Sequence, residues 1–553
     1  MSNSRKKNST NFLVQGSILA IASIISRIIG LIYRVPLTGI IGDIGNDYYS
    51  SAYSIYNILL IISSYSLPLA VSKLVSANIS KGRRRNVYRI LKCALIFALI
   101  SGTIAALILF FGADFITSTL LRTPLSIFAV KTLVPVLIIV ALLGVMRGFF
   151  QGLGTMMPSA VSQILEQIAN AVVSVWAAYI LFSYGEKAGA LLGDPANYSA
   201  AYGAAGGTIG TGVGALVALL FSAFVMVIYL RVFRKRMRKE RKNAVNSYGS
   251  IFHLLILTII PVLMSSTIYN CNTMIDQAVF KNIAFFQGYA KSDYSVWNGI
   301  YAGKYQVLIN VPIAIASSLA ASCVPALTAA YANGKRGEAK RQIATATRFI
   351  MVIAFPCAVG MGVLASPILQ MIFRDDRELS ARILQVGAIS IVFFSLSTLS
   401  NGILQGMNRM KEPIKNALIA LVLHLLLLVG LMLGLDLNIF GVVIANAAFG
   451  LIMCILNARS IRKYSGFRHE VRKTFLVPAL ASAAMGVVVW LVYHLFLYVV
   501  RANIIATIFA IMAGAIIYVV LLLLLKGLSE HEILRFPKGQ AFVSLAKKMH
   551  LLH

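Results

Sequence analysis

The sequence predicts an all-α protein that crosses a membrane many times, and three observations support this fold class. Of the 553 residues 59% are hydrophobic and only 12% are charged, whereas about 25% of an ordinary soluble chain is charged. Apolar runs of about 20 residues, which is the length of a membrane-spanning helix, recur from end to end. No stretch shows the alternating pattern of a membrane β-barrel.

Fourteen transmembrane helices are expected from these runs. They are assigned to residues 12–34, 51–76, 90–111, 124–146, 159–183, 203–230, 251–280, 298–328, 349–373, 383–404, 414–434, 438–457, 475–499 and 503–525. With the N-terminus inside, the cytoplasmic segments carry roughly four times as many Lys and Arg residues as the outside loops. Both termini are therefore predicted to be cytoplasmic. The first run lacks a cleavage signature, so we expect an uncleaved first span.

The net charge of +32 is explained by these cytoplasmic loops and does not indicate nucleic-acid binding. The densest basic segment, "RVFRKRMRKERK" at 231–242, is predicted to anchor the topology and to link two lobes. Contact of this segment with anionic lipid headgroups is the alternative.

An internal repeat divides the chain. The motif G-x-x-Q-G ends both the fourth and the tenth span, with Gln151 and Gln405 separated by 254 residues, and each motif is followed by Met and then Pro. Tyr56 and Tyr305 recur at a similar offset. A unit of six spans gives two lobes of the same orientation, as in transporters with parallel repeats. The expected domains are an N-lobe at 1–230, a linker at 231–250, a C-lobe at 251–457, and two further helices with a cytoplasmic tail at 458–553.

Charged residues inside the spans are candidates for function, because a charge facing lipid is costly. Arg27 and Arg34 are seven residues apart and therefore lie within about 20° of one another on one helix face, with Ser26 on or near it. Lys304 belongs to the other lobe, and we expect a cavity between the lobes to bring the three cations together. Interhelical ion pairs, with Asp47 or Asp276 as partners, are the alternative. For Lys73, near a helix end, snorkelling is the favoured interpretation.

Three further residues inside the spans are candidates for ion coupling: Asp276, Glu166 and His424. Carboxylates and imidazole can carry a proton or help to bind Na⁺, and structural hydrogen bonds are the alternative for each. We expect no catalytic residue, no metal site and no resident cofactor, because the chain lacks H-E-x-x-H, G-x-S-x-G and G-x-x-x-x-G-K-[ST]. A membrane glycosyl polymerase is the alternative enzyme class, and the outer acids Asp375, Asp376 and Glu378 are its only dense acidic cluster.

The first span carries the most specific resemblance to a known family. "SRIIGLIYR" resembles an S-R-hydrophobic-hydrophobic-G-x-x-x-R element, and "GDIGNDYY" places Asp47 at an acidic position of the MurJ/YtgP/SpoVB group. This group of lipid II flippases belongs to the multidrug/oligosaccharidyl-lipid/polysaccharide (MOP) exporter superfamily. Lys304 in "YAGKYQ" and Asp276 in "NTMIDQAVF" fall at a basic and an acidic position of the same group. The second span lacks the arginines of Gram-negative members, which points to the YtgP/SpoVB branch.

The resemblance implies a flippase of the bacterial plasma membrane that moves lipid II, an undecaprenyl-pyrophosphate-linked wall precursor, to the outer leaflet by alternating access. Arg27, Arg34, Lys304, Ser26 and Asp47 are the implied substrate contacts. Coupling to a Na⁺ or H⁺ gradient or to the membrane potential is open. The alternatives are a flippase for another lipid-linked polysaccharide unit or a spore cortex precursor, and a cation-coupled drug exporter. The protein is expected to be a monomer. Its expected partners are the lipid-linked oligosaccharide, anionic lipids and the wall synthesis machinery.

Overall fold

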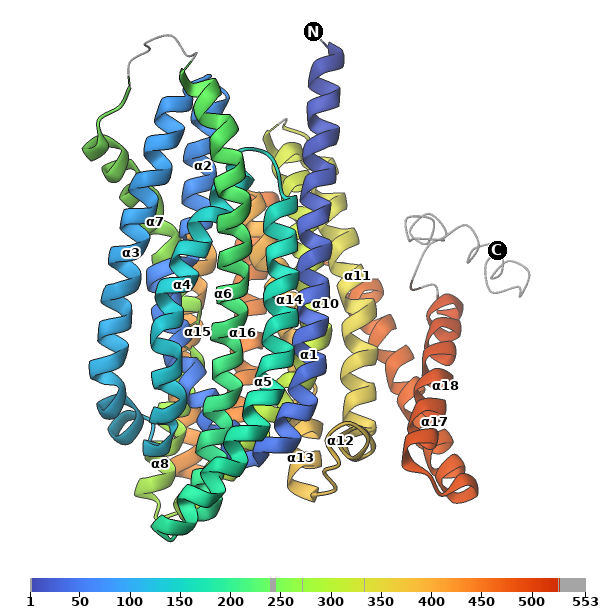
Figure 1. Ribbon diagram of the computed structural model, residues 1–553. Coiled ribbons are helices and arrows are strands. Elements are labelled where there is room, and N and C mark those ends of the chain that lie inside the picture. The colour runs from blue at the N-terminus through green and yellow to red at the C-terminus, as the bar shows by residue number, and fades with distance from the viewer. Residues whose placement is uncertain (1, 239–244, 271, 333, 526, 528–553) are drawn as a thin grey trace. The chain divides into compact units, whose positions relative to one another are not determined.

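The computed structural model describes residues 2–238, 245–270, 272–332, 334–525 and 527 (Figure 1). These residues form helices and turns, and no strand occurs among them. The all-α class is thereby confirmed. Contacts group the chain into two compact units, Met1–Gly303 and Lys304–His553. Part of the basic linker and the predicted C-terminal tail at 528–553 lie outside the described residues.

The first unit is built from nine helices of the described chain. They are α1 (Ser2–Leu60), α2 (Leu67–Ile79), α3 (Arg84–Phe115), α4 (Ile127–Gly152), α5 (Met157–Leu192), α6 (Pro195–Arg238), α7 (Tyr248–Asn270), α8 (Asn272–Phe286) and α9 (Lys291–Ile300). Short helical turns lie between them, namely η1 (Ile61–Tyr65), η2 (Ile116–Leu120) and η3 (Pro124–Ser126).

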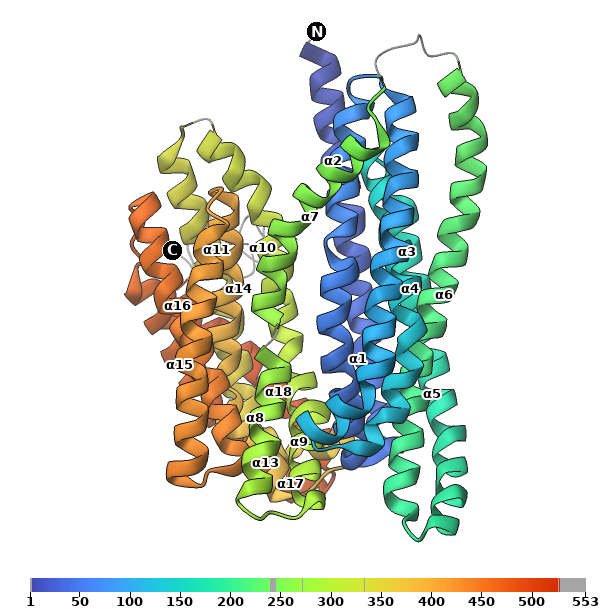
Figure 2. The same ribbon diagram turned by 90° about the vertical axis from the view of Figure 1, so that its left-hand side faces the viewer.

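Helix α1 is a helical hairpin rather than one straight rod. Gly42 has φ 67° and ψ −172°, a conformation that is open to glycine because it has no Cβ. The Asn46 amide closes the turn by donating to the Gly42 carbonyl at 2.8 Å, and the Thr38 hydroxyl donates to Asn46 at 3.3 Å. The chain runs along the unit before this turn and returns after it toward α2 (Figures 1 and 2). The first two predicted spans therefore share this hairpin and its extension.

Helices α5 and α6 pack closely because α6 presents glycines to α5. A Cβ at Gly206 would lie 2.5 Å from backbone atoms of Ala177 and Ala178, and one at Gly210 would overlap the backbone of Ser174. The glycine-rich stretch at 203–215 is thus a helix contact surface, as expected where small residues let backbones approach.

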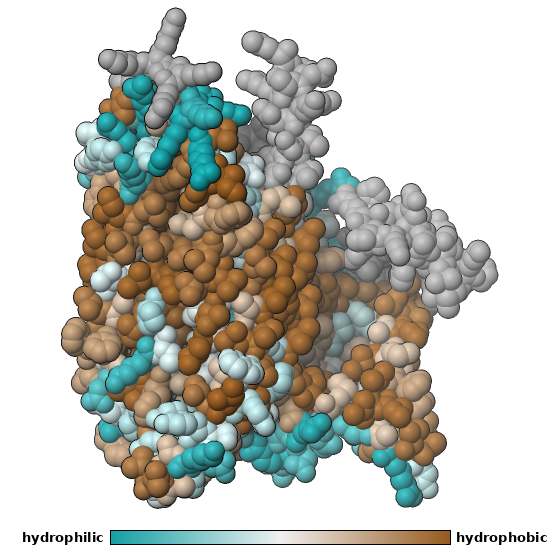
Figure 3. Space-filling model, viewed as in Figure 1, coloured by the Kyte–Doolittle hydropathy of each residue, from teal (hydrophilic) through white to brown (hydrophobic). Residues whose placement is uncertain are grey.

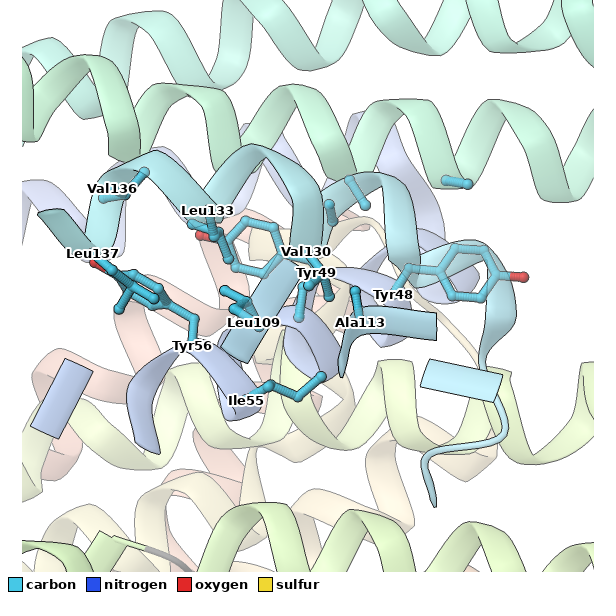
Figure 4. Close-up of a cluster of buried hydrophobic side chains, with 14 of the residues drawn as sticks. Tyr48, Tyr49, Ile55, Tyr56, Leu109, Ala113, Val130, Leu133, Val136 and Leu137 are labelled. Atoms are coloured by element: carbon cyan, nitrogen blue, oxygen red, sulfur yellow. The ribbon is translucent and has the colours of Figure 1, made fainter. Parts of the chain in front are cut away.

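The core of the first unit is rich in tyrosine (Figure 4). Tyr48, Tyr49 and Tyr56 of α1 are at most 3% exposed. They belong to one cluster with apolar side chains of α3, α4 and α6. Buried tyrosines carry a hydroxyl that needs a partner, so this core is apolar in bulk but holds polar groups at chosen positions.

The outer surface of the first unit carries large apolar side chains. Phe111 is 78% exposed and Trp176 is 64% exposed. Apolar residues cover the middle of this face, and hydrophilic residues gather at its upper end, over the ends of α3 and α6 (Figure 3). Such a surface suits hydrocarbon and would be a liability in water.

The second unit follows a short π-helical turn, η4 (Tyr301–Tyr305), at the boundary between the units. Its helices are α10 (Gln306–Ala332), α11 (Arg336–Val363), α12 (Ala365–Phe373), α13 (Glu378–Gly387), α14 (Ser390–Gly406), α15 (Lys411–Leu435), α16 (Asn438–Ser465), α17 (Val477–Val500) and α18 (Asn503–Leu524), with the turn η5 (Arg472–Leu476) before α17.

The described residues contain ten helices long and apolar enough to cross a membrane, or eleven if a bent pair counts as one span. The stretch Ile21–Ile79 counts once but holds the first two predicted spans. Predicted spans 3–6 correspond to α3–α6, and span 9 covers the end of α11 and all of α12. Span 10 corresponds to the pair α13 and α14, and spans 11–14 correspond to α15–α18. Spans 7 and 8 fall on α7–α10, which are only partly described. The structure is compatible with fourteen spans and does not fix that number.

The two G-x-x-Q-G motifs have the same local structure. Each ends a helix, α4 or α14, and is followed after two residues by a left-handed residue, Gly154 (φ 82°) or Asn408 (φ 59°). A Cβ at Gly148 would overlap the backbone of Pro68, and one at Gly402 would lie 3.1 Å from Ala320. A duplication predicts such matching contacts. The lobe boundaries at 230 and 251 stay a prediction, since contacts divide the chain after Gly303.

Candidate functional site

Arg27 and Arg34 lie on the first limb of the α1 hairpin, in regular helix before the turn at Gly42. Their spacing places them on one helix face, as the sequence predicted. Arg27 is exposed and Arg34 is partly exposed. Neither forms an ion pair with a carboxylate of the described chain. Ser26, one residue before Arg27, has a buried hydroxyl without a hydrogen-bond partner among the described residues.

An aromatic ring holds Arg34 instead of a carboxylate. The guanidinium carbon lies 4.2 Å from the centroid of the Tyr49 ring, which comes from the second limb of the same hairpin. Tyr49 in turn stacks on Tyr53, with the ring centroids 4.7 Å apart and an angle of 25° between the planes. The Tyr53 hydroxyl is hydrogen-bonded to Thr211 of α6. The arginine thus rests on a supported aromatic platform.

A polar stripe on α5 faces the first limb of α1. The Ser23 hydroxyl donates to Gln163 at 3.4 Å, and the Asn170 amide donates to the Tyr33 hydroxyl at 3.3 Å. Further along, Ser174 donates to the Gly207 carbonyl at 2.8 Å. Only Glu166 of this helix stands out in the sequence as a charge inside a span. The signal for the stripe is the spacing of its polar residues, which repeats with the period of a helix face at Gln163, Gln167, Asn170 and Ser174.

Asp47 is the centre of a fully buried ion pair that the sequence did not predict. Its Oδ1 lies 2.5 Å from the Lys281 ammonium, and both side chains have 0% exposure. Lys281 also donates to the Ser51 hydroxyl at 2.8 Å, and the Asn298 amide donates to Asp47 at 2.6 Å. Asp47 Oδ2 is buried without a hydrogen-bond partner in the described chain.

This pair fastens α8 and α9 to the α1 hairpin. A Cβ at Gly299 of α9 would collide with the Asp43 carbonyl, so the two backbones approach as closely as glycine permits. The predicted span at 251–280 ends one residue before Lys281, so the sequence predicts an outside loop at this position. Nothing in the local sequence marks it as buried, since its partner is more than 200 residues away.

Lys304 has a carboxylate partner in the second unit. Its ammonium lies 2.6 Å from Asp375 Oδ2, and both side chains are buried. Asp375 also accepts hydrogen bonds from Arg377 and Ser380. Burial by itself raises the pKa of Asp375, but the hydrogen bonds from Arg377, Lys304 and Ser380 outweigh it and hold this pKa well below its usual value. The ion-pair alternative thus describes Lys304 in this structure, with Asp375 as the partner rather than Asp47 or Asp276.

The ion-coupling candidates have structural partners. Glu166 forms an ion pair with Arg147 of α4 at 2.7 Å, and Arg147 Nε also donates to Ser162. His424 is fully buried, with Nδ1 2.9 Å from the Ala445 carbonyl. The buried Asp276 accepts a hydrogen bond from the Asn272 amide at 3.3 Å.

Within the described chain, no three His, Cys, Asp or Glu residues converge as a metal site would require. Lys73 is exposed, as the snorkelling interpretation expects. The cations Arg147, Lys281 and Lys304 are thus paired with carboxylates, whereas the two arginines of α1 have no carboxylate partner in the part of the chain that the structure describes.

The fold resembles those of several solved membrane proteins. The chain resembles a structure described as "Lipid II flippase MurJ, inward closed conformation", with a TM-score of 0.64 and 16% identity over 91% of this chain and 97% of that one. An inward-facing multidrug resistance transporter of the MATE family matches with a TM-score of 0.59 and 15% identity, over 79% of this chain and 99% of that one. At such identities these likenesses show that the chain shares the fold of these two proteins.

The family follows from the sequence. Residues 13–330 match the family described as "Polysaccharide biosynthesis protein", and residues 306–429 match MatE. The lipid II flippase MurJ of Bacillus subtilis (strain 168) is 25% identical over 87% of this chain and 88% of its own. Stage V sporulation protein B of the same strain is 24% identical, over 95% and 98%. The chain belongs to the polysaccharide biosynthesis protein family, and it resembles MurJ and stage V sporulation protein B over most of its length. The similar proteins whose descriptions state an activity are flippases and transporters, not enzymes.

Proposed function

We propose that this protein is a flippase that moves an undecaprenyl-pyrophosphate-linked cell-wall precursor, lipid II in the first place, from the inner to the outer leaflet of a bacterial plasma membrane. Transport proceeds by alternating access, and both termini are cytoplasmic. The similarity to the MurJ flippase of Bacillus subtilis supports this substrate. The segregation of basic residues in the sequence supports the orientation.

The single observation that carries the proposal is the pair of arginines without carboxylates on the first limb of α1. A diphosphate cannot enter hydrocarbon unaccompanied, because burying an unpaired charge is very costly. Arginine suits the role of its counter-charge, since its planar fork donates two hydrogen bonds to phosphate and stays protonated. A structural cation would be expected to have a carboxylate partner, as Arg147 and Lys281 do.

Three further contacts belong to the proposal. The unpartnered Ser26 hydroxyl is a donor one residue from Arg27. Lys304 takes part only if it exchanges Asp375 for the substrate anion. Asp47 acts through the cation that it holds, Lys281, rather than by direct contact. Three residues remain candidates for coupling transport to an ion gradient: Asp276, Glu166 and His424. Each would have to break the contact with its structural partner in order to bind the coupling ion.

Two other substrates are supported by particular observations. The similarity to stage V sporulation protein B, over nearly the full length of both chains, favours a spore cortex precursor or another lipid-linked polysaccharide unit. The MATE-like fold supports a drug exporter, but two unpaired arginines would repel the cationic drugs that such an exporter carries.

The deciding experiment is depletion of the protein in its native cell, followed by measurement of which lipid-linked precursor accumulates on the inner leaflet. We expect lipid II to accumulate, and wild-type protein to restore its export. Arg27→Ala or Arg34→Ala should lower export by about tenfold or more, the effect of losing a hydrogen bond to a charged group. Lys73→Ala is the matched control, since it removes an exposed basic residue of the neighbouring span and should export normally.

Two results would contradict the proposal. Accumulation of a different lipid-linked precursor would move the assignment to one of the other substrates. Normal export by both arginine variants, at wild-type protein levels, would show that these cations do not contact the substrate.

A further inference from the structure

The contact between Arg34 and Tyr49 has a chemical consequence that a salt bridge would not have. A carboxylate partner would neutralise the guanidinium and occupy its in-plane N–H donors. An aromatic face attracts the cation through the ring quadrupole and leaves those donors unused. At 4.2 Å from the Tyr49 centroid, Arg34 is therefore held in place while its charge and its hydrogen-bonding fork stay available.

The ring itself is fixed from two sides. Tyr49 is 1% exposed and stacks on Tyr53, whose hydroxyl is bonded to Thr211 of α6. A Cβ at Gly207 of α6 would lie 3.1 Å from the Tyr49 ring, so glycine at this position leaves just enough space for the aromatic side chain. The hydroxyl of Tyr49 is buried close to Tyr33 and Tyr53. The stacking on Tyr53 and the contact with Gly207 hold the ring in place.

We infer that Tyr49 is a positioning residue for anion binding: its ring orients Arg34 without neutralising it, and so presents a full guanidinium charge to the phosphate of the substrate. This inference rests on the proposed function. Aromatic character at position 49 is the required property, and the phenol hydroxyl is dispensable.

The test uses the full-length protein in proteoliposomes with a fluorescent lipid-linked pyrophosphate precursor, and measures half-saturation (KM) and maximal rate separately. Tyr49→Met replaces the ring with an aliphatic side chain of similar reach. We expect its KM to rise roughly two- to thirty-fold, the range of a cation–π contact, with a maximal rate close to that of wild type. Tyr49→Phe keeps the ring, and its KM should stay within about twofold of wild type.

The neighbouring Tyr48 offers a matched control. It is equally buried, at 1% exposure, but its hydroxyl lies 3.3 Å from Asn197 and its ring does not contact Arg34. Tyr48→Met therefore creates a similar packing defect and should leave KM unchanged. If Tyr49→Met fails to accumulate, Tyr49→Leu, which also removes the ring, replaces it in the comparison, with Tyr48→Leu as its control.

The outcomes separate this inference from the proposed function. A normal KM and rate for both Arg27→Ala and Arg34→Ala would overturn the proposed function itself, and a normal KM for Arg34→Ala alone would overturn the positioning role. Loss of transport in Arg34→Ala, together with equal KM values for Tyr49→Met and Tyr48→Met, would overturn only the positioning role. A large rise in KM for Tyr49→Phe would show that the hydroxyl, and not the ring, is what matters.

Discussion

At the scale of single residues, the partner of each buried charge separates cations that maintain structure from cations that are available to a ligand. Lys281 meets Asp47 at 2.5 Å with both side chains at 0% exposure, and Arg147 meets Glu166 at 2.7 Å. Arg34 has an aromatic ring instead. The attraction within a buried ion pair is largely offset by the desolvation of its two charges. The first two pairs therefore serve mainly to fix the positions of their helices, whereas the charge of Arg34 is not neutralised by a carboxylate.

The Lys281–Asp47 pair gives a prediction about stability. Lys281→Met leaves a carboxylate buried without its cation, and we expect the free energy of unfolding to fall by about 3–5 kcal/mol. Adding Asp47→Leu removes the stranded charge and should recover most of this loss. Denaturation of the purified protein in detergent measures both variants.

Lys291→Met is the matched control for that series, because Lys291 is exposed and lies just ten residues further along the chain. It should change stability by no more than about 0.5 kcal/mol. Equal stabilities of the single and the double variant would mean that the pair is not coupled, and the buried network would then owe its stability to Asn298 and Ser51.

At the scale of helices, small residues decide which elements approach each other. The α5–α6 pair is tight because Gly206 and Gly210 face backbone atoms of α5. Membrane helices gain little from burying apolar surface against each other, since lipid is equally apolar, so close packing supplies the contact energy. The polar stripe on α5 thereby receives a fixed position opposite α1.

Gly206→Ala tests this packing. The added methyl has no space beside Ala177 and Ala178, and we expect a loss of about 1–3 kcal/mol from overpacking. Gly430→Ala on α15 is the control, since a Cβ there meets nothing within 4 Å and alanine favours helix. The thermal unfolding temperature should therefore fall for Gly206→Ala, and it should stay the same or rise for Gly430→Ala. An unchanged unfolding temperature for Gly206→Ala would show that α5 and α6 can move apart without a loss of stability.

At the scale of the whole molecule, the arrangement of the first unit makes the proposed topology testable. Lys81 lies in the turn between α2 and α3, and Leu191 lies at the end of α5, at the opposite end of the unit (Figure 1). In a cysteine-free background, Leu191→Cys, which replaces a side chain with 90% exposure, should react with an impermeant maleimide on intact cells. Lys81→Cys should react only after the membrane is opened. The reverse pattern would place the N-terminus outside.

Much of the fold was predictable from the sequence because apolar length and the positions of glycines are local properties. The matched helix ends at Gln151 and Gln405 and the close packing of 203–215 follow from residue types and spacing alone. The site was predictable only in part. The unpaired cations Arg27 and Arg34 stand out in an apolar run, whereas Lys281 and Asp375 gain their roles from partners remote in the sequence, and no local pattern encodes such pairings.

Arg34 and Tyr49 lie on opposite limbs of the α1 hairpin, and the turn at Gly42 joins those limbs. The position of the guanidinium over the ring therefore depends on the angle between the limbs. Under the proposed function, a change in that angle would alter both the orientation of Arg34 and the affinity of the site for an anion. Bending of the backbone at Gly42 would then be coupled to anion affinity directly, without a chain of intervening side chains.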